Sequence, residues 1–376
     1  MRFTHLSLSN WKNFQTVEID LERRAFIVGP NASGKSNLLD AFRFLRDIAN
    51  PEGGFQRAVK SRGGVSQIRC LHARRYPAIA IAVDLEVENV RWYYRLGFTQ
   101  DQQRNIRITK ELVQRNGLEV LSRPNHDDQT DPDRLSQTHL EQVTANKEFR
   151  EIADFLSQIR YLHIVPQLIR DTEQSQRKHF DPYGSDFLDQ IASVSERTRI
   201  SRLKRINQAL RAAVPQFESL ELQRDDHGRP HLRVLYKHWR PQSGWQTEEQ
   251  FSDGTLRLIG LMWSIMDGTA PLLLEEPELS LHSEVVKSIP SMIVHAQRRS
   301  SRQIFLSTHS ADLLADEGIA LSEVIVLNPS ESGTQVATAH SIEQVRSLVE
   351  GGLNIAEAIV SRTKPRNADQ LAIAFD

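Results

Sequence analysis

Alternating apolar and polar residues mark many of the strands that this sequence predicts. Alternation puts every second side chain on the same face, as in a strand with one buried side. Such runs cover residues 2–9, 16–21, 78–88, 90–98 and part of 105–121. The inward positions expected in the first run are Phe3, Leu6 and Leu8. The pair Glu88-Asn89 separates two of the runs and predicts the turn of an antiparallel hairpin.

Fully apolar runs predict a second kind of strand, buried on both faces. They lie at 25–28, 271–274, 304–306 and 324–327. Parallel sheets covered by helices on both sides contain strands of this kind. We therefore expect an α/β protein with a mixed central sheet, an antiparallel sheet lobe and a short helical insertion.

Helical spacing of apolar residues predicts helices after residue 37, within 140–160 and within 186–214. The outer face of the last stretch is basic, and it either faces water or meets nucleic-acid phosphates. Its basic residues are Arg197, Arg199, Arg202, Lys204, Arg205 and Arg211. Residues 50–76 are also basic and loop-rich, which is typical of a solvated surface. The polar stretch 122–138 is expected to be a mobile loop.

Composition excludes several classes of protein. The chain has 376 residues, 39% of them hydrophobic and 25% charged, with a net charge of −1 and one cysteine, Cys70. A single cysteine excludes a disulfide framework and a cysteine-built zinc site, and it fits a reducing cytoplasm. The alternating N-terminal residues do not resemble a signal peptide. No apolar run approaches the roughly 18 residues of a membrane span. We expect a cytoplasmic protein without a membrane partner.

Residues 29–37 match the pattern G-x-x-x-x-G-K-[ST] between a strand and a helix. In that setting backbone N–H groups cradle a polyphosphate, and the helix dipole adds attraction. Lys35 reaches the β- and γ-phosphates, and the Ser36 hydroxyl binds Mg²⁺. The expected cofactors are therefore ATP and Mg²⁺. The expected ATP contacts in the loop are Gly29, Pro30, Asn31, Ala32, Ser33, Gly34, Lys35, Ser36 and Asn37.

Acidic residues follow the apolar run 271–274 directly. Burying two carboxylates without a cation is costly, so Glu275 and Glu276 predict chemistry rather than packing. We expect Glu275 to hold Mg²⁺, directly or through water, and Glu276 to act as the general base for the attacking water.

Two further motifs accompany these carboxylates. Ser252-Asp253-Gly254 opens a helical run and predicts a second anion site, although Ser252 also fits an ordinary N-cap. Another buried strand ends at His309.

The order of these motifs resembles the ABC-type ATPase heads of the SMC, RecF and OLD (overcoming lysogenization defect) families. The resemblance is carried by residues 1–50 and 245–330, and the middle of the chain shares only the general layout. It implies that Ser252, Asp253 and Gly254 form the signature that caps the γ-phosphate bound by the opposite subunit. It also implies that His309 contacts the γ-phosphate. Most P-loop ATPases carry Asp where this chain has Glu275.

The same resemblance implies roles for two more residues. Lys12, in the segment Asn10 to Phe14, resembles a basic residue near the nucleotide, and a solvated turn lysine is the alternative. Gln167 follows a short predicted strand and resembles the Q-loop glutamine that senses Mg²⁺ and the attacking water.

The resemblance divides the chain into four parts. They are an N-terminal ATPase lobe (1–168), an insertion (169–244), a C-terminal ATPase lobe (245–350) and a C-terminal tail (351–376). The insertion has no heptads sustained long enough for a coiled-coil rod.

The expected function is an ATPase that forms a homodimer or larger homo-oligomer with ATP and regulates a bacterial DNA-maintenance or phage-defence system. OLD-type nucleases continue past the histidine strand into a Toprim domain, which needs an Asp-x-Asp pair. No such pair occurs in residues 310–376, so we expect a separate effector protein, such as a nuclease. The alternative is a RecF-like repair protein that binds DNA itself. A transporter subunit and a scaffold without enzymatic activity fit less well.

Overall fold

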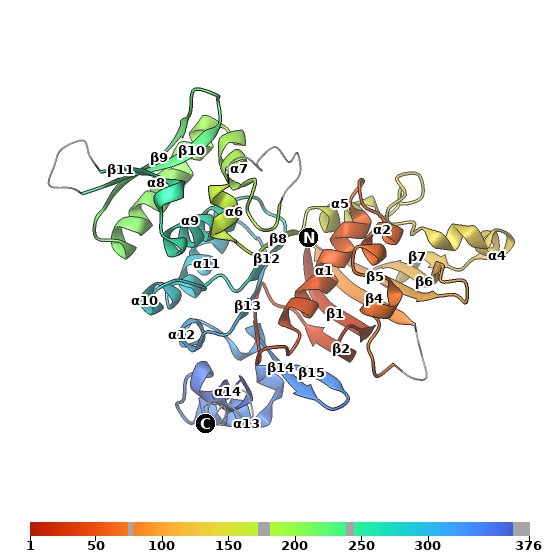
Figure 1. Cartoon of the computed structure of the whole chain (residues 1–376). Helices are drawn as coiled ribbons and strands as arrows, with labels where there is room; N and C mark the ends of the chain where they lie inside the picture. Colours follow the sequence, from red (N-terminus) through yellow and green to blue (C-terminus); the bar gives the residue numbers. More distant parts are fainter. Residues whose placement is uncertain (74–77, 172–180, 238–243, 364–376) are drawn as a thin grey trace, which may run out of the picture.

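A computed structural model describes residues 1–73, 78–171, 181–237 and 244–363. Its elements form two sheet-and-helix cores and a smaller lobe (Figure 1). Within the described residues, no helix is both long enough and apolar enough to cross a membrane.

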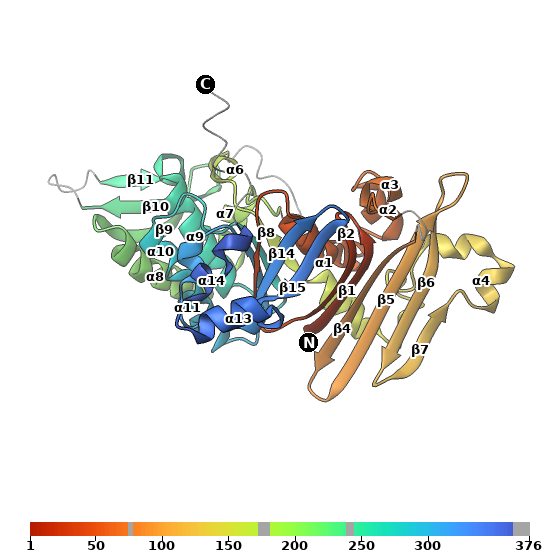
Figure 2. The same cartoon turned by 90° about the horizontal axis from the view of Figure 1, so that it is seen from below.

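The first sheet is antiparallel and has six strands in the order β2-β1-β4-β5-β6-β7 (Figure 2). They are β1 (Arg2–Trp11), β2 (Phe14–Asp20), β4 (Ile79–Val87), β5 (Val90–Gln100), β6 (Ile106–Arg115) and β7 (Leu118–Arg123). Phe3, Leu6 and Leu8 are fully buried, as the alternation predicts. The expected hairpin is also confirmed, because Val87 pairs with Val90 across the turn.

The second sheet is mixed, which confirms the predicted fold class. Its order is β15-β14-β3-β13-β12-β8, and only β15 runs antiparallel to its neighbour. The strands are β3 (Arg24–Val28), β8 (Arg160–Leu162), β12 (Leu272–Glu275), β13 (Ile304–Thr308), β14 (Val324–Ser330) and β15 (Gly333–Thr338).

Helices cover both faces of this mixed sheet, which explains its continuous apolar strands. The helix α1 (Lys35–Ala49) packs on the face that carries Ile27, Leu273 and Phe305. The other face, with Phe26, Leu274 and Leu306, packs against α9 (Asp253–Met266) and α11 (Ile289–Gln297). Neighbouring side chains on a strand thus enter different cores, as the pleat requires.

The third sheet belongs to the smaller lobe, at the opposite end of the molecule from β6 and β7 (Figure 1). It contains β9 (Phe217–Arg224), β10 (Pro230–Tyr236) and β11 (Trp245–Thr247), and it is preceded by α6 (Pro166–Arg170), α7 (Phe187–Ser193) and α8 (Glu196–Ala213). The predicted helical stretch 186–214 is therefore two helices.

Most of the remaining elements are short helices. They are α2 (Phe55–Lys60), α3 (Val65–Ile68), α5 (Arg150–Ser157), η3 (Glu248–Gln250), α10 (Ser283–Val286), α12 (Ala311–Leu314), η4 (Leu321–Glu323), η5 (Ala339–Ser341), α13 (Glu343–Glu350) and α14 (Ile355–Thr363). The helix expected within 140–160 is confined to α5.

The segment expected as a tail after residue 350 contains α14, whose Ile355 and Ile359 are buried in the second core. The four-part division of the chain stays a prediction.

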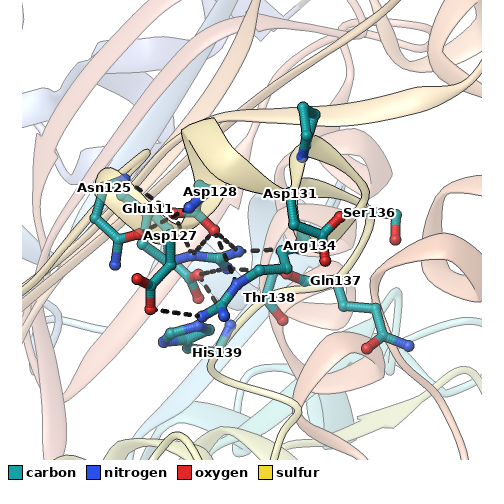
Figure 3. A network of polar contacts seen from close by, with 12 residues as sticks. Glu111, Asn125, Asp127, Asp128, Asp131, Arg134, Ser136, Gln137, Thr138 and His139 are labelled. Carbon is teal, nitrogen blue, oxygen red and sulfur yellow. Dashed lines mark hydrogen bonds and ion pairs between the residues drawn. The ribbon is translucent and has the colours of Figure 1, made fainter.

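The polar stretch 122–138 was expected to be a loop, and that prediction is wrong. It contains α4 (His126–Thr130) and η1 (Pro132–Ser136), whose polar side chains belong to a network of hydrogen bonds and ion pairs (Figure 3). Arg123 is fully buried and binds several members of this network. Arg123 bonds Asp128 at 2.7 Å and Glu111 at 2.9 Å, and both acids are buried. It also donates to the carbonyls of Arg134 and Gln137, each at 2.9 Å. Burial raises the pKa of Glu111. Burial opposes ionisation of Asp128 too, yet the bonds from Arg123 lower its pKa.

Replacing Arg123 by Met is expected to destabilise the protein by about 3–5 kcal/mol, because two buried carboxylates lose their cation. Urea unfolding, followed by intrinsic fluorescence, measures this loss. Arg107→Met is the matched control, since Arg107 on β6 pairs with the exposed Asp133 at 2.9 Å. The control should cost about 1 kcal/mol or less. Equal losses in the two variants would contradict the structural importance of the buried cluster.

Candidate functional site

The phosphate-binding loop connects β3 to α1 through two residues in the left-handed region. Ala32 has φ 61° and Gly34 has φ 99°. A Cβ on Gly34 would lie 2.2 Å from Nδ2 of Asn13, so only glycine fits this turn. The turn directs the N-terminus of α1 toward the carboxyl edge of the mixed sheet, as anion binding requires.

Two polar side chains hold the loop in place. The Asn13 amide and the Thr334 hydroxyl donate to the carbonyl of Ser33 at 2.8 and 2.9 Å. The side chain of Asn37 donates to Asn13 at 2.8 Å. Sequence reasoning missed Asn13 and Thr334. The motif around Lys12 pointed to this segment, but the residue that contacts the loop is the next one along the chain.

Lys35 is almost fully buried beneath the loop. Its ammonium donates to the carbonyls of Gly29 at 3.1 Å and Pro30 at 3.2 Å, and it lies 3.4 Å from Nδ1 of His309. Burial lowers the pKa of Lys35, and nearby carboxylates, with Glu276 the strongest, oppose this effect. A lysine held by neutral carbonyls can transfer its bonds to an anionic phosphate.

Ser36 and Glu275 meet at the same edge. The Ser36 hydroxyl donates to Oε1 of Glu275, and the phenol of Tyr161 donates to the other oxygen, Oε2. Burial and then the neighbouring Glu275 raise the pKa of Tyr161, so its hydroxyl keeps its proton. Tyr161 was not among the sequence candidates, because nothing along the chain shows that β8 and β12 are neighbours.

Glu276 and His309 form an ion pair or hydrogen bond, with 3.0 Å between Oε1 and Nε2. Glu276 has φ 45°, an uncommon conformation for a glutamate that often marks functional sites. Its N–H donates to the carbonyl of Ser307 on β13 at 3.1 Å. Burial and then Lys35 lower the pKa of His309, whereas Glu276 raises it.

Glu278 fixes the backbone that carries His309. Its Oε1 accepts from the Thr308 hydroxyl at 2.5 Å and from the N–H of His309 at 3.1 Å. Its Oε2 is buried without a partner among the described residues. Burial raises the pKa of Glu278. The sequence analysis gave this residue no function.

The signature motif begins helix α9. Ser252 is its N-cap and accepts from the N–H of Thr255 at 3.1 Å. Asp253 accepts from Arg170 at 2.6 Å and from Gln167 at 3.3 Å. A Cβ on Gly254 would lie 2.5 Å from the carbonyl of Ser280, so the motif also packs against the segment after Glu278. Ser252 remains exposed and Gly254 half-buried.

Lys12 and Gln167 have other partners. The Lys12 ammonium lies 2.6 Å from Asp40, beside Arg62. Lys12 also lines the open cleft described next. Gln167 lies on α6 and bonds Asp253 of the signature. The structure thus brings together Lys35, Ser36, Glu275, Glu276 and His309, and the roles of Lys12 and Gln167 stay predictions.

An open cleft of about 1090 Å³ extends from Ser36 and Glu275. Its wall is rich in cationic side chains: Lys12, Arg43, Arg62 and Arg69. Within the described parts of the chain, no group of three or more His, Cys, Asp or Glu is placed to hold a metal ion. The local donor set is instead one hydroxyl and one carboxylate. That set suits Mg²⁺, which usually takes one or two carboxylates together with substrate phosphates and water. The site therefore fits Mg²⁺ with ATP.

The fold and the order of these elements are those of an ABC-type P-loop ATPase. Residues 24–316 match the family described as "AAA domain, putative AbiEii toxin, Type IV TA system", so the chain belongs to that family.

Two curated proteins are similar over a short segment. Endonuclease GajA from Bacillus cereus (strain VD045) is 38% identical over 58 residues, which cover 15% of this chain and 10% of GajA. The DNA replication and repair protein RecF from Roseiflexus castenholzii (strain DSM 13941 / HLO8) is 38% identical over 58 residues, 15% of each chain. These matches span only a small part of either relative.

Solved SMC heads share the fold over nearly the whole chain. An SMC head bound to the C-winged helix domain of ScpA has a TM-score of 0.54 and 14% identity, covering 90% of this chain and 98% of that one. An SMC head with an extended coiled coil, bound to the C-terminal domain of ScpA derived from Pyrococcus furiosus, has a TM-score of 0.50 and 13% identity, covering 93% and 98%.

Proposed function

We propose that this protein binds and hydrolyses ATP with Mg²⁺ at the cleft above the mixed sheet. The observation that supports this most is the meeting of Lys35, Ser36, Glu275, Glu276 and His309 at one sheet edge. These side chains come from the ends of two strands, β12 and β13, and from the helix α1. Three acids lie near one buried lysine, an excess of negative charge that a divalent cation such as Mg²⁺ would offset.

Each residue has a proposed role. Lys35 leaves the carbonyls of Gly29 and Pro30 and binds the β- and γ-phosphates. Ser36 and Glu275 hold Mg²⁺, which when bound neutralises charge that develops on the phosphates. Glu276 takes the proton of the attacking water, and His309 orients Glu276 and contacts the γ-phosphate.

We propose further that a second copy of the chain completes each site. Ser252 and Gly254 lie at the start of α9, where a serine hydroxyl and backbone N–H groups can meet a γ-phosphate from outside. In the SMC-like arrangement this phosphate belongs to the opposite subunit. ATP would then hold two protomers together.

The biological role that we propose is regulation of a separate effector, such as a nuclease, in DNA maintenance or phage defence. Its support is limited to the family match and to the short similarity with an endonuclease and a repair protein. The alternative is a RecF-like protein that binds DNA directly. It is favoured by the exposed side chains of Arg197, Lys204 and Arg205 on α8, which have no ionic partner among the described residues.

DNA binding measured at several salt concentrations separates these two roles. An effector regulator is expected to bind duplex DNA weakly and to retain a partner, encoded nearby, when ATP is present. A RecF-like protein is expected to bind DNA with a steep salt dependence. Replacing the three α8 residues by Gln should then reduce the slope of log K against log salt by about 3. The control is the double variant Lys60→Gln and Lys147→Gln, since both lysines are exposed and lie outside the smaller lobe that carries α8. Cleavage of DNA by the pure protein, lost in an active-site variant, would contradict the need for a separate nuclease.

A further inference from the structure

The phenol of Tyr161 points at the carboxylate that we expect to hold Mg²⁺. Strands β8 and β12 are parallel, and Tyr161 pairs with Leu273, so the two side chains share a face. Both belong to the core beneath α1, whereas the next residues, Leu162 and Leu274, belong to the opposite core. Glu275 lies two residues beyond Leu273 and therefore projects to the Tyr161 side.

Two hydroxyls divide the oxygens of Glu275 between them. Ser36 donates to Oε1 from the start of α1, and Tyr161 donates to Oε2 from β8. Tyr161 is only 4% exposed. The guanidinium of Arg43 lies over its ring, 4.0 Å from the centroid. The ring is thus buried and lies under Arg43, and its hydroxyl is directed at the carboxylate.

A glutamate needs such support more than an aspartate does. It has one more rotatable bond, so more conformational freedom must be lost before it can hold a cation in one geometry. Residues that hydrogen-bond a metal ligand without touching the metal commonly contribute about 10–100-fold to metal affinity in metalloproteins. We expect an effect of about that size here. Tyr161 has the position of such a partner.

We propose that Tyr161 is a positioning residue for the divalent cation. Its hydroxyl binds one oxygen of Glu275 and leaves the other, beside Ser36, to face the cation. The chain thereby uses a glutamate where most P-loop ATPases use an aspartate. This inference rests on the proposed ATP and Mg²⁺ site.

The test is the Mg²⁺ dependence of ATP binding by the Tyr161→Phe protein, measured with a fluorescent ATP analogue. Phenylalanine keeps the ring and its contact with Arg43 and removes only the hydroxyl. We expect the variant to need at least about 10-fold more Mg²⁺ than the wild type to reach half of the Mg²⁺-dependent increase in ATP affinity. Affinity in EDTA should equal that of the wild type, because Lys35 and the loop still bind the phosphates. Thermal unfolding in EDTA shows whether the fold is intact.

Tyr94→Phe is a matched control. Tyr94 is fully buried on β5, and its hydroxyl also donates to a glutamate, Glu111, at 3.3 Å. It lies in the antiparallel sheet, so its loss should leave the Mg²⁺ dependence unchanged. In a Glu275→Gln background, Tyr161→Phe should have no further effect, because the carboxylate that it positions is gone.

The outcomes separate this inference from the proposed function. If the wild-type protein shows no Mg²⁺-dependent nucleotide binding, the proposed function fails. If the wild type shows it and the Tyr161→Phe protein has the same Mg²⁺ requirement, the positioning role of Tyr161 is overturned. A higher Mg²⁺ requirement in the Tyr161→Phe protein alone supports the role.

Discussion

Glu276→Gln is expected to bind ATP with Mg²⁺ at the wild-type affinity and to hydrolyse it at least about 100-fold more slowly, the usual scale for removing a general base. Glutamine fills the same volume and can still contact His309, but it cannot accept the proton of water. Lys35, Ser36 and Glu275 remain in place to hold phosphate and Mg²⁺. Phosphate release under single-turnover conditions, with a parallel binding measurement, separates chemistry from affinity.

Lys35→Ala should behave in the opposite way. Its ammonium is the cation that lies beneath the loop, so its removal should abolish detectable ATP binding rather than slow a bound complex. Glu284→Gln is the control for the change from acid to amide, since Glu284 is exposed and pairs with Lys287 at 2.7 Å. If the Glu276→Gln protein turns over ATP as fast as the control, Glu276 is not the base.

The central part of the site could be predicted because each motif is local. The loop pattern, the acids at the end of β12 and the histidine after β13 each follow an apolar strand. In parallel strands such ends share one edge of the sheet, so their meeting follows from the order of the elements. The contact of 3.0 Å between Glu276 and His309 is consistent with that reasoning.

Contacts between distant segments could not be predicted in the same way. Tyr161 bonds Glu275 only because β8 is placed beside β12, and Asn13 and Thr334 meet the loop only because β15 lies beside β2 (Figure 2). A tyrosine in a short apolar run is more often a core residue. No feature of its neighbours in the sequence distinguishes it from one.

The loop prediction for the polar stretch 122–138 was wrong for a related reason. Its charges favour water when the segment is considered alone. In the fold, Arg123 binds Asp128 within the segment and Glu111 outside it, so none of the three charges is buried without a partner. The N–H groups of His139 and Leu140 then donate to the same Glu111, at 2.9 and 3.1 Å. Local composition contains no information about that partner.

A mixture of two inactive variants, Lys35→Ala and Ser252→Asp, is expected to recover about a quarter of wild-type ATPase activity if the protein works as a symmetric dimer with sites completed in trans. Half of the dimers in an equal mixture contain one copy of each variant. In such a dimer, one site combines the intact loop of one subunit with the intact signature of the other. A site completed within one chain would stay broken in every protomer.

The choice of Ser252→Asp keeps the structure intact while opposing phosphate. Ser252 caps α9 by accepting from the N–H of Thr255, and aspartate caps helices as well as serine does. Its charge, however, repels a γ-phosphate from another subunit. Ser195→Asp is the matched control, because Ser195 caps α8 with a threonine at the equivalent position and lies in the smaller lobe. The control should keep full activity by itself.

Formation of the mixed dimers must be verified with two affinity tags, in the presence of ATP. Zero recovered activity in verified mixed dimers would reject the trans arrangement, even if each single variant is inactive. If ATPase activity recovers only in complexes that carry both tags, Ser252 acts on a nucleotide held by the other chain. In that case ATP is part of the interface itself, and assembly should weaken as ATP is removed, because a ligand bound only by the dimer stabilises the dimer.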